Sequence, residues 1–132
     1  MITMNLQDFG AELQRLTLEA LTNIEIGVTE VAEDLASVSQ KLAPLDEGGL
    51  MENATVEPAI NASGAITAKV GYNKKYALMR HEAFYNLGAT SANKPSVDGM
   101  QVGRKFLAQP ITKYSQKYVD HIASKMMGAN NP

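Results

Sequence analysis

The chain of 132 residues contains no cysteine, which excludes both a disulfide framework and a thiolate metal site. Its formal net charge is only -2, so strong general attraction to nucleic acid or anionic lipid is not expected. No apolar run approaches the roughly 20 residues of a membrane span. The first residues also lack the basic and apolar regions of a signal peptide. We therefore expect a soluble protein made in a cytosol.

Motifs that would indicate catalysis are absent or incomplete. His81-Glu82 begins like a zinc-protease motif, but Tyr85 stands where the second histidine is required. Asp46 and Glu47 are adjacent in a glycine-rich turn, a poor arrangement for holding two acids across a substrate. We therefore expect no catalytic, cofactor-binding or metal-binding residues, and we interpret His81 and Glu82 as a hydrogen-bonded structural pair.

The sequence does contain one long amphipathic pattern, in which apolar side chains recur every three or four residues without an intervening proline. The members of this stripe are Phe9, Leu13, Leu16, Ala20, Ile24, Val28, Val31, Leu35, Val38 and Leu42. The pattern predicts a helix over residues 5–42 with the stripe as the domain core. Pro44 ends the helix, because proline disfavours a helical residue before it. At a rise of about 1.5 Å per residue the helix is a rod of roughly 50 Å, which a single small sheet cannot cover. We infer that part of it contacts another chain.

Two apolar residues of this helix, Leu18 and Ile26, lie away from the stripe among polar neighbours. Single apolar residues on a surface are common, so one interpretation is that they have no special role. The other interpretation is that they contact a second subunit. The sequence leaves both open.

A hairpin is predicted over residues 53–72. Its first strand begins at Asn53, and Pro58 either ends that strand or lies at a sheet edge, since proline cannot donate to the ladder. Residues 61–64 have the composition of a turn. Residues 66–72 then alternate apolar and polar side chains, as a half-buried strand does.

The remainder of the chain is predicted to be a loop and a second helix. Residues 88–103 are rich in Gly, Ser, Asn and Pro and have almost no large apolar side chain, which is typical of an exposed, mobile loop. A C-terminal helix is predicted over residues 108–127, with Pro110 suited to a first helical position and Gly128 as its stop. The predicted fold is one α+β domain over residues 1–132, with the long N-terminal helix packed on a small antiparallel β-sheet.

Several short motifs follow one another in a particular order. They are Ala43-Pro44-x-Asp46-Glu47-Gly48-Gly49-Leu50 after the long helix, Tyr76-Ala77 and His81-Glu82 after the hairpin, and Gly103-x-Lys105-Phe106-Leu107 before the last helix. This order resembles the minor capsid or tail-completion proteins of long-tailed bacteriophages, which join head and tail, over roughly residues 10–125. One departure is Glu47-Gly48-Gly49, where a single glycine is commoner in that family.

The resemblance implies an assembly role without catalysis, in the neck of a virion assembled in the host cytoplasm. It implies a homo-oligomeric ring, with six subunits as the expected number, that contacts a phage head-completion or adaptor protein and the tail tube protein. Position as a tail terminator or as a head–tail adaptor stays open. No specific binding of nucleic acid and no membrane contact are expected. The alternatives are a small cytosolic enzyme using His81 and Glu82 and an accessory protein that binds nucleic acid.

Two sets of residues follow from these patterns. The expected subunit or partner contacts are Leu18, Ile26, Lys94, Pro95, Met100 and Arg104. The residues expected to set the fold are Pro44, Asp46, Gly48, Tyr76, Glu82 and Phe106. Within the second set, Asp46 and Glu82 would anchor turns by hydrogen bonds, and Tyr76 and Phe106 would be core aromatic residues.

Overall fold

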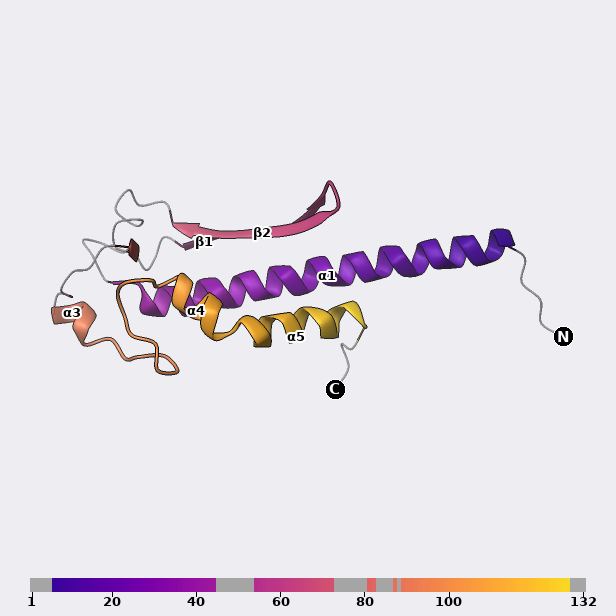
Figure 1. Ribbon diagram of the computed structural model, residues 1–132. Helices are drawn as coiled ribbons and strands as arrows, with labels where there is room; N and C mark the ends of the chain where they lie inside the picture. Colours follow the sequence, from indigo (N-terminus) through magenta and orange to yellow (C-terminus); the bar gives the residue numbers. More distant parts are fainter. Residues whose placement is uncertain (1–5, 45–53, 73–80, 83–86, 88, 129–132) are drawn as a thin grey trace.

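A computed structural model describes residues 6–44, 54–72, 81–82, 87 and 89–128 of the chain. The elements are α1 (Leu6–Leu42), β1 (Ala54–Ala62), β2 (Ala65–Tyr72), α3 (Ala89–Ala92), α4 (Ala108–Lys113) and α5 (Ser115–Met126). The hairpin lies along one side of α1 and α5 lies along another (Figure 1). The predicted α+β fold class, with a long N-terminal helix, a small antiparallel sheet and a C-terminal helix, is confirmed. The helix predicted as one element over residues 108–127 is divided into α4 and α5, because Tyr114 between them has a non-helical backbone conformation with φ -104° and ψ 12°. None of the described helices is long and apolar enough to cross a membrane.

Helix α1 has 37 residues and begins within one residue of its predicted start. At the usual rise per residue this length corresponds to about 55 Å. In Figure 1 its N-terminal turns extend beyond both the tip of the hairpin and the end of α5. The rest of α1 lies between the hairpin and α5, and contacts both.

The buried part of α1 is its C-terminal part rather than the whole predicted stripe. Val38 and Leu42 are buried, whereas Leu35 is only half-buried and Leu16 is 47% exposed. The other buried residues of α1 include Gly27, Ala32, Ala36 and Ser39. The expectation that the complete stripe forms the core is therefore wrong, because the hairpin, α5 and the segment before α4 cover only part of the helix.

The hairpin closes with a two-residue turn at Ser63-Gly64. Both residues have positive φ, 54° and 82°, as a type I′ turn requires. The flanking pair is Ala62 with Ala65, so the first half of the predicted four-residue turn belongs to β1. Glycine tolerates this backbone conformation without strain, which explains why the turn falls here rather than one residue earlier.

Pro58 lies where the pairing of the two strands is irregular. The register shifts between Glu57 and Ile60, and β1 continues to Ala62, so Pro58 does not end the strand. In a two-stranded sheet each strand is an edge, where proline is tolerated. At the same irregularity the backbone N–H of Ala59 donates to Thr29 Oγ1 of α1 at 2.9 Å. This bond connects the bulged strand directly to the helix.

The core lies at the C-terminal end of α1. Phe106 is 1% exposed and packs with Leu42 and Met100, which are 0% and 5% exposed. The ring of Phe106 meets that of Tyr72 edge to face at a centroid distance of 5.1 Å. Tyr72 in turn shares a hydrogen bond of 2.7 Å with the hydroxyl of buried Ser39. One aromatic ring therefore connects the hairpin, α1 and the segment before α4.

The segment from 89 to 103 differs from the exposed loop that its composition predicts. Ser91 and Met100 are buried, and Val97 pairs with Met100 in a β-bridge around the turn at Asp98-Gly99. The backbone N–H of Gly103 donates to the carbonyl of Leu42, the last residue of α1, at 2.8 Å. Backbone pairing, the buried side chain of Met100 and the hydrogen bonds from Lys94 Nζ to the carbonyls of Gln40 and Ala43 hold this segment against α1, although its sequence has few apolar residues.

Candidate functional site

His81 and Glu82 are held by partners within the chain. The backbone N–H of Ala108, at the start of α4, donates to His81 Nε2 at 3.1 Å. Because an amide N–H can only donate, Nε2 is the acceptor and Nδ1 carries the ring proton. Nδ1 therefore donates to the carboxylate of Glu82, at 3.0 Å. Neither ring nitrogen is left to act as a general base.

Glu82 also forms an ion pair with Lys105. The hydrogen bond from Lys105, followed by that from His81, lowers the pKa of the Glu82 carboxyl. The backbone of the pair is fixed as well, because Lys105 N–H donates to the His81 carbonyl at 2.7 Å and Arg104 Nε donates to the Glu82 carbonyl at 2.8 Å. These contacts join residues 81–82 to the segment that carries Phe106, whose ring meets that of His81 edge to face at a centroid distance of 5.1 Å. The pair acts as a structural clamp.

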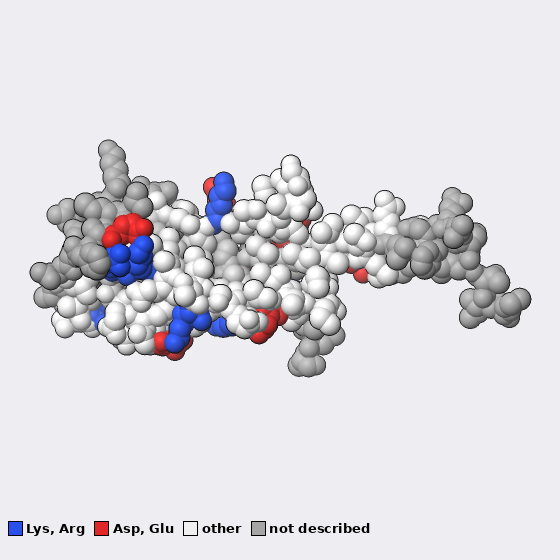
Figure 2. All heavy atoms as spheres, viewed as in Figure 1, with Lys and Arg blue, Asp and Glu red and all other residues white. Residues whose placement is uncertain are grey.

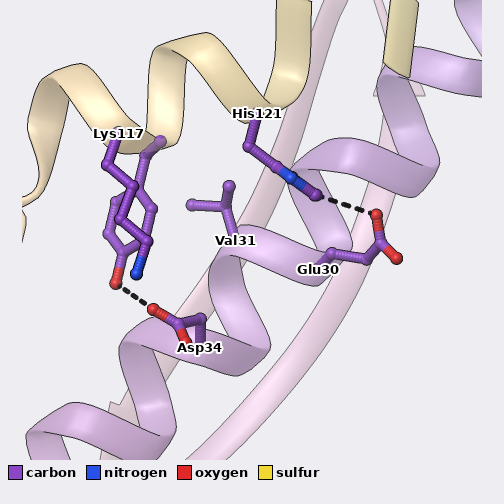
Figure 3. Close-up of a pocket in the computed structure, with 6 residues that line it drawn as sticks. Glu30, Val31, Asp34, Lys117 and His121 are labelled. Carbon is purple, nitrogen blue, oxygen red and sulfur yellow. Dashed lines mark hydrogen bonds and ion pairs between the residues drawn. The ribbon is translucent and has the colours of Figure 1, made fainter. Parts of the chain in front are cut away.

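A second polar cluster lies between α1 and α5, around a cleft of about 470 Å³ (Figure 3). The Tyr118 hydroxyl donates to Asp34 Oδ2 at 2.8 Å. One turn earlier on α1, Glu30 Oε1 lies 3.0 Å from His121 Nε2 and 3.5 Å from Lys125 Nζ. We call this set of contacts the α1–α5 seam.

The two helices approach closely beside the seam because α1 has a glycine there. A Cβ placed on Gly27 would lie only 3.3 Å from the Cα of Ile122 and 3.3 Å from side-chain carbons of Lys125. The sequence did carry this signal, since an isolated glycine within a helical pattern often marks a close packing contact. Our sequence interpretation missed it.

The charged and polar groups of the seam are paired with one another. The hydrogen bond with His121 is the largest of the effects that lower the pKa of Glu30. Burial, followed by the hydrogen bond to Asp34, raises the pKa of Tyr118. Over the described ranges, no three His, Asp or Glu side chains are grouped so that they could hold a metal ion. We therefore interpret the seam as the contact that holds α5 on α1.

Alkaline titration tests the seam together with Tyr114, whose ring packs against that of Tyr118. The hydroxyl of Tyr114 donates to Asp98, which raises the pKa of Tyr114 to about 12, and the pKa of Tyr118 is raised as well. A raised pKa in the fold means that the neutral phenol is favoured. The resulting stability is fully present below a pH of about 10, which is the ordinary pKa of tyrosine. It is lost as the pH rises through the higher pKa that the tyrosine has in the folded protein.

We therefore predict that unfolding free energy falls steeply above a pH of about 10. The variant Tyr118→Phe should be less stable than the wild type at neutral pH, because Asp34 loses its donor. It should also lose less stability between neutral and alkaline pH. Chemical denaturation at a series of pH values, with tyrosinate absorbance recorded in parallel, measures both effects. An unchanged pH dependence in Tyr118→Phe would contradict the role assigned to this bond.

The outer side of α1 carries two shallow depressions. One of about 430 Å³ is lined by Arg15, Leu18, Glu19, Thr22 and Asn23. The next, of about 280 Å³, is lined by Thr22, Glu25, Ile26, Thr29, Glu30 and Ala59. Since both include Thr22, they form one continuous surface, which we call the outer α1 face. Leu18 and Ile26 are 60% and 47% exposed on it, so the structure brings these two predicted contact residues onto a single surface.

The other predicted contact residues have different positions. Met100 is a core residue, and its assignment as a subunit contact is corrected, because its side chain is 5% exposed. Lys94 Nζ donates to the carbonyls of Ala43 and Gln40 at 2.6 and 3.3 Å and thus caps the C-terminal end of α1. Burial lowers the pKa of its ammonium group. Pro95 is exposed, and Arg104 is half-buried.

Half of the residues expected to set the fold can be located in the structure. Pro44 and Phe106 are buried, and Glu82 makes the clamp contacts given above. Asp46, Gly48 and Tyr76 lie outside the described residues.

No protein-family model, curated protein or solved structure matches this chain.

Proposed function

We propose that this protein is a structural component of the neck of a long-tailed bacteriophage. In this role it forms a homo-oligomeric ring between the head connector and the tail tube and performs no chemistry of its own. The observation that carries the proposal is the extension of α1 beyond its own domain, with Leu16, Leu18 and Ile26 between 47% and 60% exposed. Contact with another chain would bury this apolar surface, at roughly 25 cal/mol for each Å² removed from water.

The order of the elements and short motifs supports the same proposal. The long helix ending before Pro44, the hairpin, the His81-Glu82 pair and Phe106 before the last helices follow the order that resembles the tail-completion family. In this chain the last three converge, because Phe106 contacts the rings of both Tyr72 and His81. These residues hold together the end of the domain that lies opposite the N-terminal extension of α1.

A closed ring requires that one surface of each subunit meets a different surface of its neighbour. The outer α1 face is one such surface. Its partners in the neck would be further copies of the chain, with the head-completion protein and the tail tube protein above and below. Both the terminator and the adaptor position are compatible with this arrangement.

The test is a phage from which this gene has been deleted. We expect packaged heads and assembled tails that are unjoined or malformed in electron micrographs, and a loss of infectious particles. Supplying the wild-type protein in trans should restore joining. A matched pair of variants makes the test specific: Leu18→Asp places a charge on the outer α1 face and should fail to restore joining, whereas Lys69→Asp, on the hairpin, should restore it. Infectious particles from the deletion itself would refute the proposal.

A further inference from the structure

The two depressions on the outer α1 face are lined by equivalent positions of the helix. The α1 positions that line the depression of about 280 Å³ are 22, 25, 26, 29 and 30, and those that line the depression of about 430 Å³ are 15, 18, 19, 22 and 23. Each position of the first set is seven residues after one of the second set, which is about two helical turns. The larger depression therefore repeats the smaller one, two turns nearer the N-terminal end of α1. We call the larger one the N-terminal depression.

The hairpin contributes to only one of these two depressions. Ala59 lines the smaller one, and its backbone N–H donates to Thr29 Oγ1 at 2.9 Å. The position seven residues before Thr29 is again a threonine, the exposed Thr22. Among the described residues, only residues of α1 line the N-terminal depression. This depression thus has a hydroxyl acceptor at the same place as the smaller one, but no strand beside it from its own chain.

The lining of the N-terminal depression indicates what kind of surface could cover it. Its two charged residues, Arg15 and Glu19, form an ion pair with each other at 2.6 Å. Its apolar residue, Leu18, is 60% exposed. A complementary surface would therefore be uncharged and partly apolar, with a backbone N–H for the hydroxyl of Thr22.

The closed end of the hairpin has these properties. Residues 58–68 are the longest run without Asp, Glu, Lys or Arg in the parts of the chain that the structure describes, and Ile60 within it is 64% exposed. This end of the hairpin bends away from α1 (Figure 1) and is white in Figure 2. Each strand of a two-stranded sheet also has backbone N–H groups on its outer edge that the other strand does not bond. We call residues 60–66 the hairpin tip.

We propose that the hairpin tip of one copy docks in the N-terminal depression of a second copy. Ile60 of the tip packs on Leu18, and a backbone N–H of the tip donates to Thr22 Oγ1, as Ala59 does to Thr29 within each chain. Because the two depressions share Thr22, this contact continues the one that the hairpin already makes with α1. The inference rests on the proposed ring and names the two surfaces that form it.

The hairpin tip and the N-terminal depression are different surfaces of one chain, so the contact is head to tail. Each copy offers its hairpin tip to one neighbour and its N-terminal depression to the other, and the assembly closes into a ring when the rotation between neighbours permits it. The contact also gives a role to the part of α1 that extends beyond the tip of its own hairpin (Figure 1). That part of the helix holds the hairpin of the next copy.

Cross-linking between two single-cysteine variants tests the contact, because the natural chain has no cysteine to interfere. Full-length Leu18→Cys and Ile60→Cys, mixed in equal amounts at high concentration and treated with a short bismaleimide, should give a covalent dimer in a denaturing gel. Either variant alone should stay monomeric, since its only cysteine would face a residue that cannot react. The matched control mixes Leu18→Cys with Val119→Cys, which places the second cysteine on α5 at a position that is 59% exposed, and should give no dimer. Absence of a dimer from the first mixture, or an equal yield from the control mixture, would overturn the proposal.

Sedimentation of two charged variants gives an independent test. Ile60→Glu places a carboxylate against Leu18 and should weaken self-association about tenfold or more. Val119→Glu, at an equally exposed position outside the contact, should associate as the wild type does, and circular dichroism checks that both variants are folded. Association of Ile60→Glu that equals that of the wild type would contradict the contact.

The contact and the proposed function can fail separately. If Leu18→Cys and Ile60→Cys do not cross-link, while deletion of the gene still leaves heads and tails unjoined, the contact is wrong and the proposed function stands. A cross-linked dimer from a protein whose deletion leaves the phage infectious would support the contact and refute the proposed function.

Discussion

Replacing Leu42 with aspartate is expected to unfold the domain. Leu42 is 0% exposed at the end of α1 and packs in the cluster that contains Phe106 and Met100. A carboxylate there would lose its hydration without an ionic partner, at a cost of several kcal/mol. The whole stability of a domain of this size is about 5 to 15 kcal/mol. Far-ultraviolet circular dichroism and thermal melting of the purified variant measure the loss.

The matched comparison is Leu35→Asp, two turns earlier on the same helix. Leu35 and Leu42 both belong to the apolar stripe of the sequence, but Leu35 is only half-buried. An aspartate at position 35 could therefore stay partly hydrated. We therefore expect a smaller drop in melting temperature from Leu35→Asp than from Leu42→Asp. A Leu42→Asp variant that melts at the wild-type temperature would show that the core has been placed incorrectly.

Truncating Phe106 to alanine should have the next largest effect, a loss of about 3 to 5 kcal/mol of unfolding free energy. The side chain is 1% exposed, and its ring makes edge-to-face contacts with Tyr72 and His81 at 5.1 Å each. The variant would leave a cavity where the hairpin, the His81-Glu82 clamp and α1 meet. These elements could fill the cavity only by shifting, which would break other contacts that they make. Urea denaturation gives the free energy directly.

The control for this truncation is Ile111→Ala. Ile111 is 49% exposed on α4, five residues from Phe106, so its removal should cost about 1 kcal/mol or less. The variant Phe106→Leu, which retains most of the apolar volume, should fall between the two alanine variants. Equal losses from Phe106→Ala and Ile111→Ala would contradict the position given to Phe106.

Local signals in the sequence were sufficient for the main elements. The uninterrupted repeat of apolar residues places α1 within one residue of its observed start, and Pro44 places its end. The glycine at position 64 and the alternating residues before Tyr72 are enough for the hairpin. These features depend on the backbone preferences of neighbouring residues, so they can be read without knowing what the elements contact.

Contacts between distant parts of the chain decided the rest. Leu16 and Leu42 belong to the same stripe, but only Leu42 is covered, because the segment carrying Met100 and Phe106 packs at that end of α1. The composition around Lys94 is that of an exposed loop, yet its ammonium group donates to the carbonyl of Ala43, more than 50 residues earlier in the chain, and so caps the end of α1. A periodic pattern shows which side of a helix is apolar but not which turns of that side are covered.

For the outer α1 face, too, the sequence determined one part of the result and the tertiary structure the other. The sequence alone determined that α1 is longer than its own domain can cover and that Leu18 and Ile26 lie off its stripe. Only the tertiary structure decided that these two residues share one continuous surface and that α5 turns Val119 and Met126 outward. It also decided that both nitrogens of His81 are engaged. The physical reason is that exposure and hydrogen-bond partners depend on which elements pack together, whereas helical periodicity and turn chemistry depend on near neighbours in the chain.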